Sequence, residues 1–239
     1  MPKLNKISFF YDCLSPFSYL AFHTLKRYQP VWGIDIELKP FLLGGVMAAT
    51  KNVPPAVRPW AAATAKVSAQ DMVRNKQYFN LPHMKPMPNN FFGPQGPADK
   101  TGLSSISNTY MRCLAAVSMK YPACLMGVTT GVFEMIWGDD RDGNNNVVVT
   151  PNRLARICEG AGLSTEEADL IMQKVNADSV KSILRKNVED AVALGAYGSP
   201  FIVAGDQVYF GSDRLEVMAF THDLAWVGPD PGRPSVAKL

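Results

Sequence analysis

The chain has 239 residues with 47% hydrophobic and 19% charged side chains, and its formal net charge is +3. This composition supports a folded core, the scattered basic residues form no nucleic-acid-binding stripe, and no apolar run is long enough to span a bilayer. The four cysteines have no CxxC or Cys/His metal spacing, so we expect reduced, mostly buried thiols, an intracellular protein and no bound metal; they are Cys13, Cys113, Cys124 and Cys158.

The first predicted element is a buried strand that leads into a helix. Residues 7–11 are apolar and aromatic, and a helical pattern runs from Pro16 to about Tyr28. Proline suits the first helical position and Ser15 suits the N-cap, where an anion or a thiolate is stabilised. The run Ser15-Pro16-Phe17-Ser18 has the form of the redox motif Cys-Pro-x-Cys with serine at both sulfur positions. The alternative is an ordinary Ser-Pro helix start, and Cys13 is interpreted as a packing residue.

A second strand and several helices follow in chain order. Residues 34–40 alternate apolar and charged side chains, as in a strand with one wet face, which completes a βαβ unit. The proline-rich stretch 81–102 is predicted to be loop. Residues 139–146 carry acidic and amide oxygens around a glycine but lack the closing glutamate of a calcium loop, so they are interpreted as a turn. Helical patterns cover residues 61–79, 107–121, 125–137 and 151–161, with a capping box opening the next helix at Ser164 and Glu167.

The last third returns to mixed structure. A helix over 180–194 is followed by strands at 201–204 and 208–210 around a tight turn, and Gly211-Ser212-Asp213-Arg214 opens a final helix. The order β-α-β, helical insert, α-β-β-α predicts an α/β, thioredoxin-like fold with a large all-helical domain inserted after the N-terminal βαβ unit. Residues 1–48 and 180–239 then form a discontinuous thioredoxin-like domain, and residues 49–179 form the insert. Such a fold has a proline just before its third strand, so the Ser199–Pro200 bond is predicted to be cis.

The final tripeptide Ala237-Lys238-Leu239 is a close variant of the peroxisomal address Ser-Lys-Leu. It follows a Pro/Gly-rich approach that would leave it accessible. We therefore expect the peroxisomal import receptor to be a partner. The N-terminal residues contain no apolar signal core.

The sequence resembles the kappa class of glutathione transferases over essentially its whole length. The matching runs are residues 10–20, Arg27-Tyr28-Gln29, Gly198-Ser199-Pro200-Phe201 and Phe210-Gly211-Ser212-Asp213-Arg214. The Tyr-Asp-x-x-Ser-Pro start is shared with the bacterial chromene-carboxylate isomerases, whereas its combination with Phe-Gly-Ser-Asp-Arg is more particular to the kappa class. The resemblance also implies a homodimer located in peroxisomes or, alternatively, in mitochondria.

The resemblance implies that the Ser15 hydroxyl hydrogen-bonds the glutathione sulfur. A lysine that the family often carries after the loop proline is replaced here by Ala61, and the nearest lysine is Lys66. Either Lys66 or another base would then hold the glycyl carboxylate. The remaining implied glutathione-binding positions, in the order of the chain, are Pro16, Phe17, Asn52, Ser199, Ser212 and Asp213.

These features predict a glutathione S-transferase that acts on small electrophiles, with glutathione as co-substrate and with peroxide reduction as a further activity. A free thiol with a pKa of about 8.5 is mostly protonated at neutral pH, so a hydroxyl and helix N–H groups that stabilise the thiolate would raise its reactivity. Two alternatives remain open. One is a glutathione-dependent isomerase of the 2-hydroxychromene-2-carboxylate type, and the other is a redox-inactive thioredoxin-like binding module.

Overall fold

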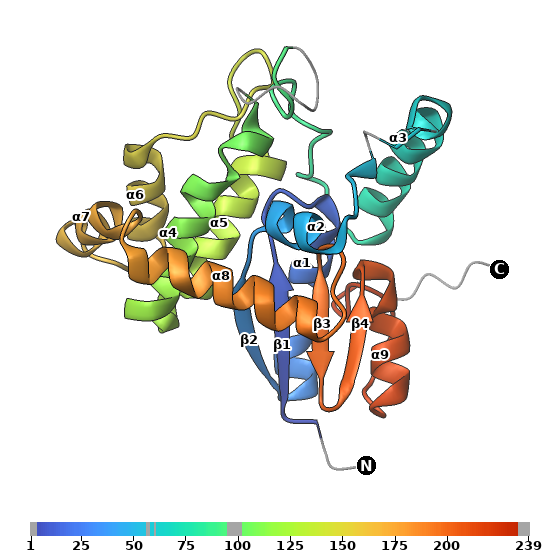
Figure 1. The fold of residues 1–239 in the computed structure, drawn as a ribbon. Coiled ribbons are helices and arrows are strands. Elements are labelled where there is room, and N and C mark those ends of the chain that lie inside the picture. Colours follow the sequence, from blue (N-terminus) through green and yellow to red (C-terminus); the bar gives the residue numbers. More distant parts are fainter. Residues whose placement is uncertain (1–3, 56–57, 60, 95–101, 234–239) are drawn as a thin grey trace.

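A four-stranded mixed sheet of order β2-β1-β3-β4 lies at the centre of the thioredoxin-like part of the molecule (Figure 1). The computed structural model describes residues 4–55, 58–59, 61–94 and 102–233. Strand β1 pairs in parallel with β2 and antiparallel with β3, and β3 forms an antiparallel hairpin with β4. This topology confirms the predicted thioredoxin-like fold. The strands are β1 (Lys6–Tyr11), β2 (Asp35–Pro40), β3 (Phe201–Ala204) and β4 (Gln207–Phe210).

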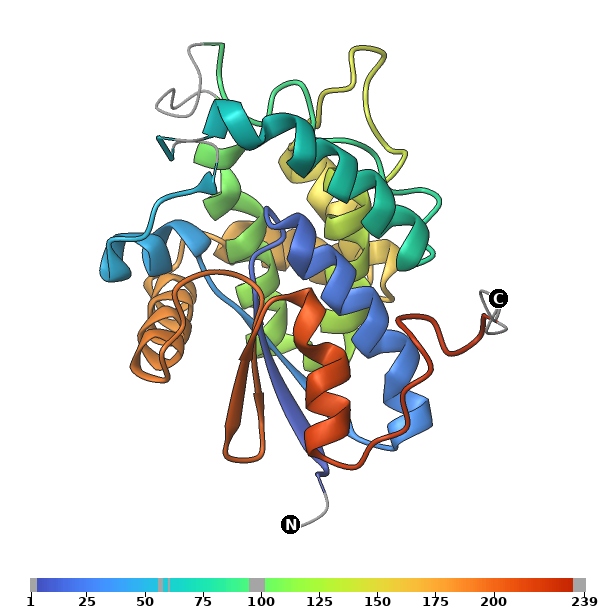
Figure 2. The ribbon, with the colours of Figure 1, turned by 90° about the vertical axis from the view of Figure 1, so that its right-hand side faces the viewer.

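Helices cover both faces of the sheet. Helix α1 (Pro16–Trp32) and helix α9 (Leu215–Thr221) lie on one side, and α8 (Asp178–Ala193) crosses the other (Figure 2). Successive side chains of a strand point to opposite faces, and β1 follows this rule. Phe9 and Tyr11 belong to the large core, whereas Phe10 belongs to a small cluster with Phe41 and Phe201 on the α8 side.

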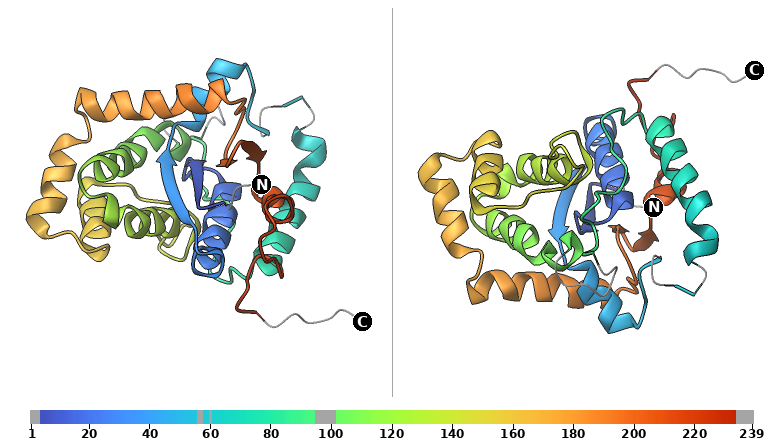
Figure 3. Two further views of the ribbon diagram at one scale, coloured as in Figure 1. Left: turned by 90° about the horizontal axis from the view of Figure 1, so that it is seen from below. Right: turned by 90° about the horizontal axis from the view of Figure 1, so that it is seen from above.

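The predicted helical segments form between the second and third strands. Helices α4 and α5 lie next to the sheet, while α6 and α7 lie at the end of the molecule farthest from it (Figures 1 and 3). The predicted capping box of Ser164 and Glu167 is present. The helices of this region are α2 (Leu43–Thr50), α3 (Ala61–Tyr78), α4 (Ser107–Lys120), α5 (Leu125–Trp137), α6 (Pro151–Gly160) and α7 (Thr165–Lys174), and its short 3₁₀ turns are η2 (Leu103–Ser105) and η3 (Pro122–Cys124). A further 3₁₀ turn, η4 (Ser212–Arg214), follows β4.

Two helices differ from the sequence prediction. Helix α1 continues beyond Tyr28 through Pro30 and ends where Gly33 adopts a left-handed conformation with φ of 63°. Helix α2 was not predicted, because Gly44 and Gly45 disfavour helix in isolation. A Cβ at position 45 would lie 3.3 Å from Val188 of α8, so the glycine allows α2 to pack closely on that helix.

The turn at residues 139–146 is closed by its own side chains. Asp142 Oδ1 accepts the backbone N–H groups of Asn144 and Asn146 at 2.9 and 2.7 Å, which is an Asx-type arrangement. Within the described ranges, no group of three or more His, Cys, Asp or Glu side chains is arranged to hold a metal ion. Among the helices of these same residues, none is long and apolar enough to cross a membrane.

The large core continues from the sheet into the helical insert. Tyr11 of β1 and Phe22 of α1 both pack against Phe133 of α5, with ring centroids 5.9 and 5.1 Å apart. The predicted domain limit at residue 48 lies within α2. The division into residues 1–48 with 180–239 and residues 49–179 therefore stays a prediction about the chain's organisation.

Candidate functional site

Ser15 is the N-cap of α1, as the sequence predicts. Its Oγ accepts the backbone N–H of Ser18 at 3.2 Å, and Pro16 occupies the first helical turn. The same hydroxyl donates to the carbonyl oxygen of Ser199 at 3.0 Å. The side chain is buried. The hydroxyl thus lies where the N-terminal N–H groups of α1 favour negative charge.

Three serines form a hydroxyl cluster at this junction. The hydroxyl oxygens of Ser18 and Ser199 lie 2.7 Å apart, and Ser199 Oγ also accepts the backbone N–H of Asp12 at 3.0 Å. The Ser199–Pro200 bond is cis, as predicted. Both serines of the Ser-Pro-x-Ser run therefore contact Ser199, Ser15 through the carbonyl and Ser18 through the side chain. Ser18 received no site role in the sequence analysis, although its place in that motif was the available signal.

Asp12 is a buried carboxylate that the sequence analysis also missed. Its Oδ1 accepts the N–H of Leu14 and its Oδ2 accepts the N–H of Leu43, each at 2.9 Å. Burial raises the pKa of Asp12 to about 6 against the opposing effect of these two hydrogen bonds. Asp12 thereby ties the loop before Ser15 to the first turn of α2. A lone acidic residue inside an apolar strand-to-helix run was the signal.

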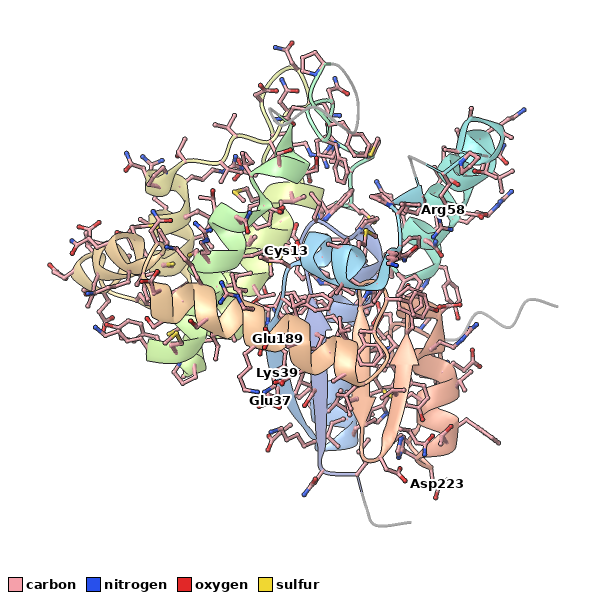
Figure 4. All side chains as sticks on the ribbon, viewed as in Figure 1. Cys13, Glu37, Lys39, Arg58, Glu189 and Asp223 are labelled. Atoms are coloured by element: carbon pink, nitrogen blue, oxygen red, sulfur yellow. The ribbon has the colours of Figure 1, made fainter. Side chains whose placement is uncertain are left out.

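Cys13 has the predicted packing role. Its backbone N–H lies 3.5 Å from the sulfur of Met111, and its carbonyl oxygen accepts the indole N–H of Trp137 at 2.8 Å. Burial raises the pKa of the Cys13 thiol, which disfavours the thiolate. The residue lies beside α2 (Figure 4). Helices α4 and α5 thus hold the loop that precedes Ser15.

Asn52 lies beside the segment that leads to Ser199. Its amide nitrogen donates to the carbonyl oxygen of Tyr197 at 2.7 Å, and its Oδ1 is 3.5 Å from a guanidinium nitrogen of Arg58. Arg58 lies between α2 and α3 (Figure 4). Lys66, the cation considered from the sequence, is exposed on α3, a helix without buried residues among those described. The contact with Asn52 therefore positions the Arg58 guanidinium beside the segment that leads to Ser199.

A backbone hydrogen bond connects the segment of Ser212 and Asp213 to Pro200, which follows Ser199. The N–H of Gly211 donates to the carbonyl oxygen of Pro200 at 3.1 Å, and η4, which contains Ser212 and Asp213, packs against α1. Ser212 is buried, whereas Asp213 is exposed and pairs with Arg214 at 2.8 Å. Gly211 has a φ of 96°, a backbone conformation that residues with a side chain rarely adopt.

Phe17 directly follows Pro16 in the first turn of α1, and its side chain is 43% exposed. An aromatic ring of this size is normally buried, so its exposure beside Ser15 leaves an apolar surface at the site.

The structure thus brings Ser15, Ser18, Ser199 and Asp12 into direct contact and connects Asn52 and Ser212 through backbone neighbours of Ser199 and Pro200.

A family model described as a DSBA-like thioredoxin domain matches residues 6–221. The fold and the site therefore define a thioredoxin domain of the DsbA type with serine at both sulfur positions. The chain is 34% identical to glutathione S-transferase kappa 1 of Rattus norvegicus over 234 residues, 96% of each protein. The chain belongs to the kappa-class glutathione S-transferase family, as its sequence resemblance predicts.

Relatives with another activity share this architecture. The chain is 26% identical to a 2-hydroxychromene-2-carboxylate isomerase of Sphingobium xenophagum over 212 residues, which are 89% of this chain and 95% of that protein. A solved structure of 2-hydroxychromene-2-carboxylate isomerase matches with a TM-score of 0.67 at 20% identity, covering 91% of this chain and 94% of that chain. This structural likeness reflects the common fold.

Proposed function

We propose that this protein conjugates glutathione to small electrophiles and that Ser15 stabilises the glutathione thiolate. The observation that carries the proposal is the buried Ser15 hydroxyl at the N-terminus of α1, bonded to the carbonyl oxygen of Ser199 at 3.0 Å. The proposal also rests on the identity to a kappa-class transferase over 96% of the chain. Since each unit of thiol pKa lowering corresponds to about 1.4 kcal/mol, one charge-assisted hydrogen bond is sufficient for a useful shift.

In the proposed mechanism the Ser15 hydroxyl changes partner when glutathione binds. Its proton points to the Ser199 carbonyl oxygen in the structure. The cysteinyl N–H of glutathione, paired with the Ser199 backbone, takes over that carbonyl and frees the hydroxyl to donate to the sulfur. The N–H of Ser18, which donates to Ser15 Oγ at 3.2 Å, keeps the oxygen in place during this exchange.

The chemical step then needs no further base from the protein. The thiol proton leaves to solvent, the thiolate forms a carbon–sulfur bond with the electrophile, and the leaving group departs with its electron pair. In the proposed peroxide activity, thiolate attack on the O–O bond consumes one proton and yields a sulfenic acid and an alcohol. A second glutathione converts the sulfenic acid to glutathione disulfide and water.

The rest of glutathione is proposed to lie across the corner that Asn52, Ser212 and Asp213 form. The exposed Asp213 carboxylate and the buried Ser212 hydroxyl suit the charged γ-glutamyl end. We propose Arg58 rather than Lys66 for the glycyl carboxylate, because Arg58 contacts Asn52 at 3.5 Å whereas Lys66 is exposed on α3. Phe17 offers its exposed ring to an apolar or aromatic electrophile.

Two measurements on the wild-type protein test this function. Glutathione at millimolar concentration should raise the melting temperature, because a ligand that binds only the native state stabilises it. Conjugation of a dinitrophenyl halide should depend on glutathione. Absence of a melting shift would favour a thioredoxin-like module that does not use glutathione.

A glutathione-dependent isomerase is the second candidate, because an isomerase relative is 26% identical over 89% of the chain. The two functions would share Ser15 and the glutathione site and differ in the second substrate. Turnover of a 2-hydroxychromene-2-carboxylate without conjugation of aryl halides would favour the isomerase.

Two further properties are proposed from the sequence. The address Ala237-Lys238-Leu239 lies outside the described residues, and we propose that it directs the protein to peroxisomes, with mitochondria as the alternative. Deletion of Leu239 should then abolish peroxisomal import of a labelled protein. A homodimer is proposed from the family resemblance, and the solution mass measures it directly.

A further inference from the structure

Two buried thiols of the helical insert lie in contact outside the glutathione site. Cys113 of α4 and Cys158 of α6 have their sulfur atoms 3.8 Å apart, although 45 positions separate them in the sequence. Both residues are fully buried. All four cysteines are among the described residues, and all are free thiols. The sulfur atoms of Cys113 and Cys158 are in contact.

The two thiols are not equivalent. The sulfur–sulfur hydrogen bond, with burial, raises the pKa of Cys113 well above its ordinary value. The same hydrogen bond lowers the pKa of Cys158, against burial and the nearby Glu159. Cys158 lies on α6, the helix farther from the sheet, and Cys113 lies on α4. Since the thiolate of the more accessible residue reacts first, we assign Cys158 as the attacking thiol and Cys113 as the thiol that resolves a mixed disulfide.

Helix α6 can give an oxidant access to this pair. It lies at the end of the molecule farthest from the sheet (Figures 1 and 3). Its fully buried residues are Leu154 and Cys158, and Ile157 also packs closely against Gly131 of α5. A helix at the edge of a molecule opens locally at a lower free energy than the whole fold unfolds, so opening of α6 would expose Cys158 without unfolding of the sheet or of Ser15.

We propose that Cys113 and Cys158 form a reversible disulfide that fastens α6 to α4 when the glutathione pool is oxidised. The thiolate of Cys158 attacks one sulfur of glutathione disulfide, forms a mixed disulfide and releases one glutathione thiolate. The thiolate of Cys113 then attacks the Cys158 sulfur and releases the second glutathione. In sum, two protein thiols lose two electrons and two protons, and one glutathione disulfide becomes two glutathione molecules.

The link has a consequence for both stability and the site. It would close a loop of 45 positions, and loops of this size are stabilised by a disulfide through the unfolded state, so we expect the melting temperature to rise by about 5 to 10 °C. Helix α4 also carries Met111, whose sulfur contacts the N–H of Cys13 at 3.5 Å. The oxidised pair therefore fixes the helix that supports the loop before Ser15.

Disulfide mapping tests the proposal on the wild-type chain. The protein is incubated with an excess of glutathione disulfide, remaining thiols are alkylated after denaturation, and unreduced peptides are analysed by mass spectrometry. We expect a peptide pair joined through Cys113 and Cys158, lost on addition of dithiothreitol. The expected result requires no transferase activity, so Ser15→Ala should form the same link, which separates this proposal from the proposed function.

Variants make the assignment specific. Cys113→Ala should leave Cys158 as a glutathione mixed disulfide, because the resolving thiol is gone, and Cys158→Ala should leave Cys113 unmodified. Cys124→Ala is the matched control and should retain both the link and the rise in melting temperature. Recovery of both Cys113 and Cys158 as alkylated thiols in the oxidised wild type would overturn the proposal, as would a link between Cys13 and Cys113 in its place.

Discussion

The hydroxyl of Ser15 donates to the carbonyl oxygen of Ser199 across 184 positions of sequence, at 3.0 Å. This bond joins the start of α1 to the segment before β3, and so joins the two halves of the thioredoxin-like part. In the structure the Ser15 hydroxyl donates its hydrogen bond to this carbonyl oxygen. We propose that a bound ligand takes over the carbonyl oxygen, so that the hydroxyl is free to donate to sulfur. Ser15 is therefore both an N-cap and the proposed donor to sulfur.

The contact between Ser18 and Ser199 predicts a modest loss of stability on truncation. Ser18→Ala removes the hydroxyl that lies 2.7 Å from Ser199 Oγ in a buried cluster. One buried hydrogen bond contributes about 1 kcal/mol, so the free energy of unfolding in denaturant should fall by about that amount. Ser179→Ala, at an exposed position of α8, is the control and should change little. Equal effects of the two substitutions would contradict the cluster.

The buried Asp12 predicts a stability change of definite sign with pH. Its pKa is raised from 3.8 to about 6 in the folded protein, so the folded state binds the proton more tightly than the unfolded state. Its contribution is most favourable below about pH 4 and is lost as pH rises through 6, a difference of about 3 kcal/mol. The free energy of unfolding of the wild type minus that of Asp12→Asn should therefore increase from pH 7 to pH 4. A constant difference would show that Asp12 is not buried as a carboxylate.

The lowered pKa of Glu37 predicts a change of stability with pH that is opposite in sign to that of Asp12. Burial opposes its ionisation, but hydrogen bonds from Ser8, Lys39 and Lys6 lower its pKa to about 2. The carboxylate and Lys39 lie on β2 (Figure 4), with their charged atoms 3.0 Å apart. Its stabilising effect is present above an unfolded pKa near 4.5 and is lost as pH falls toward 2. Glu37→Gln should destabilise the protein at pH 7 but not at pH 2, as measured by denaturant unfolding at both values.

The proposed glycyl-carboxylate site predicts that removal of the Arg58 charge and removal of the Lys66 charge change the KM for glutathione differently. Arg58→Ala should raise the KM for glutathione about tenfold, the loss expected for one charge-assisted hydrogen bond, with a smaller change in kcat. Lys66→Ala, on the exposed helix α3, is the matched control and should leave KM nearly unchanged. Steady-state kinetics with varied glutathione separates the two outcomes. A rise in KM for Lys66→Ala alone would move the site to Lys66.

The sequence predicted those parts of the structure that depend on neighbours in the chain. The apolar and aromatic run of residues 7–11 predicted a buried strand, and Ser15-Pro16 predicted a helix start. Both signals are local, because backbone geometry alone sets which side chains share a face. The order of these local elements was then enough to predict the thioredoxin-like fold.

The missed features depend on contacts between distant residues. Helix α2 contains Gly44 and Gly45 and forms against α8, where position 45 meets Val188. Asp12 has its role because Leu43, 31 positions later, presents an N–H to its carboxylate. Neither contact is visible in a local pattern, since tertiary packing overrides helix propensity and supplies the missing hydrogen-bond partners.

The central claim is that the Ser15 hydroxyl lowers the pKa of bound glutathione, and a thiolate titration measures this directly. Ultraviolet absorbance of the thiolate, followed against pH in the protein–glutathione complex, should give a pKa at least one unit below the free value of about 8.5 for the wild type. Ser15→Thr keeps a hydroxyl and should retain much of the shift. Ser15→Ala should return the pKa toward the free value and slow conjugation at least about tenfold, with the KM for glutathione little changed. A bound thiol pKa and a conjugation rate that are the same in Ser15→Ala and in the wild type would contradict the account.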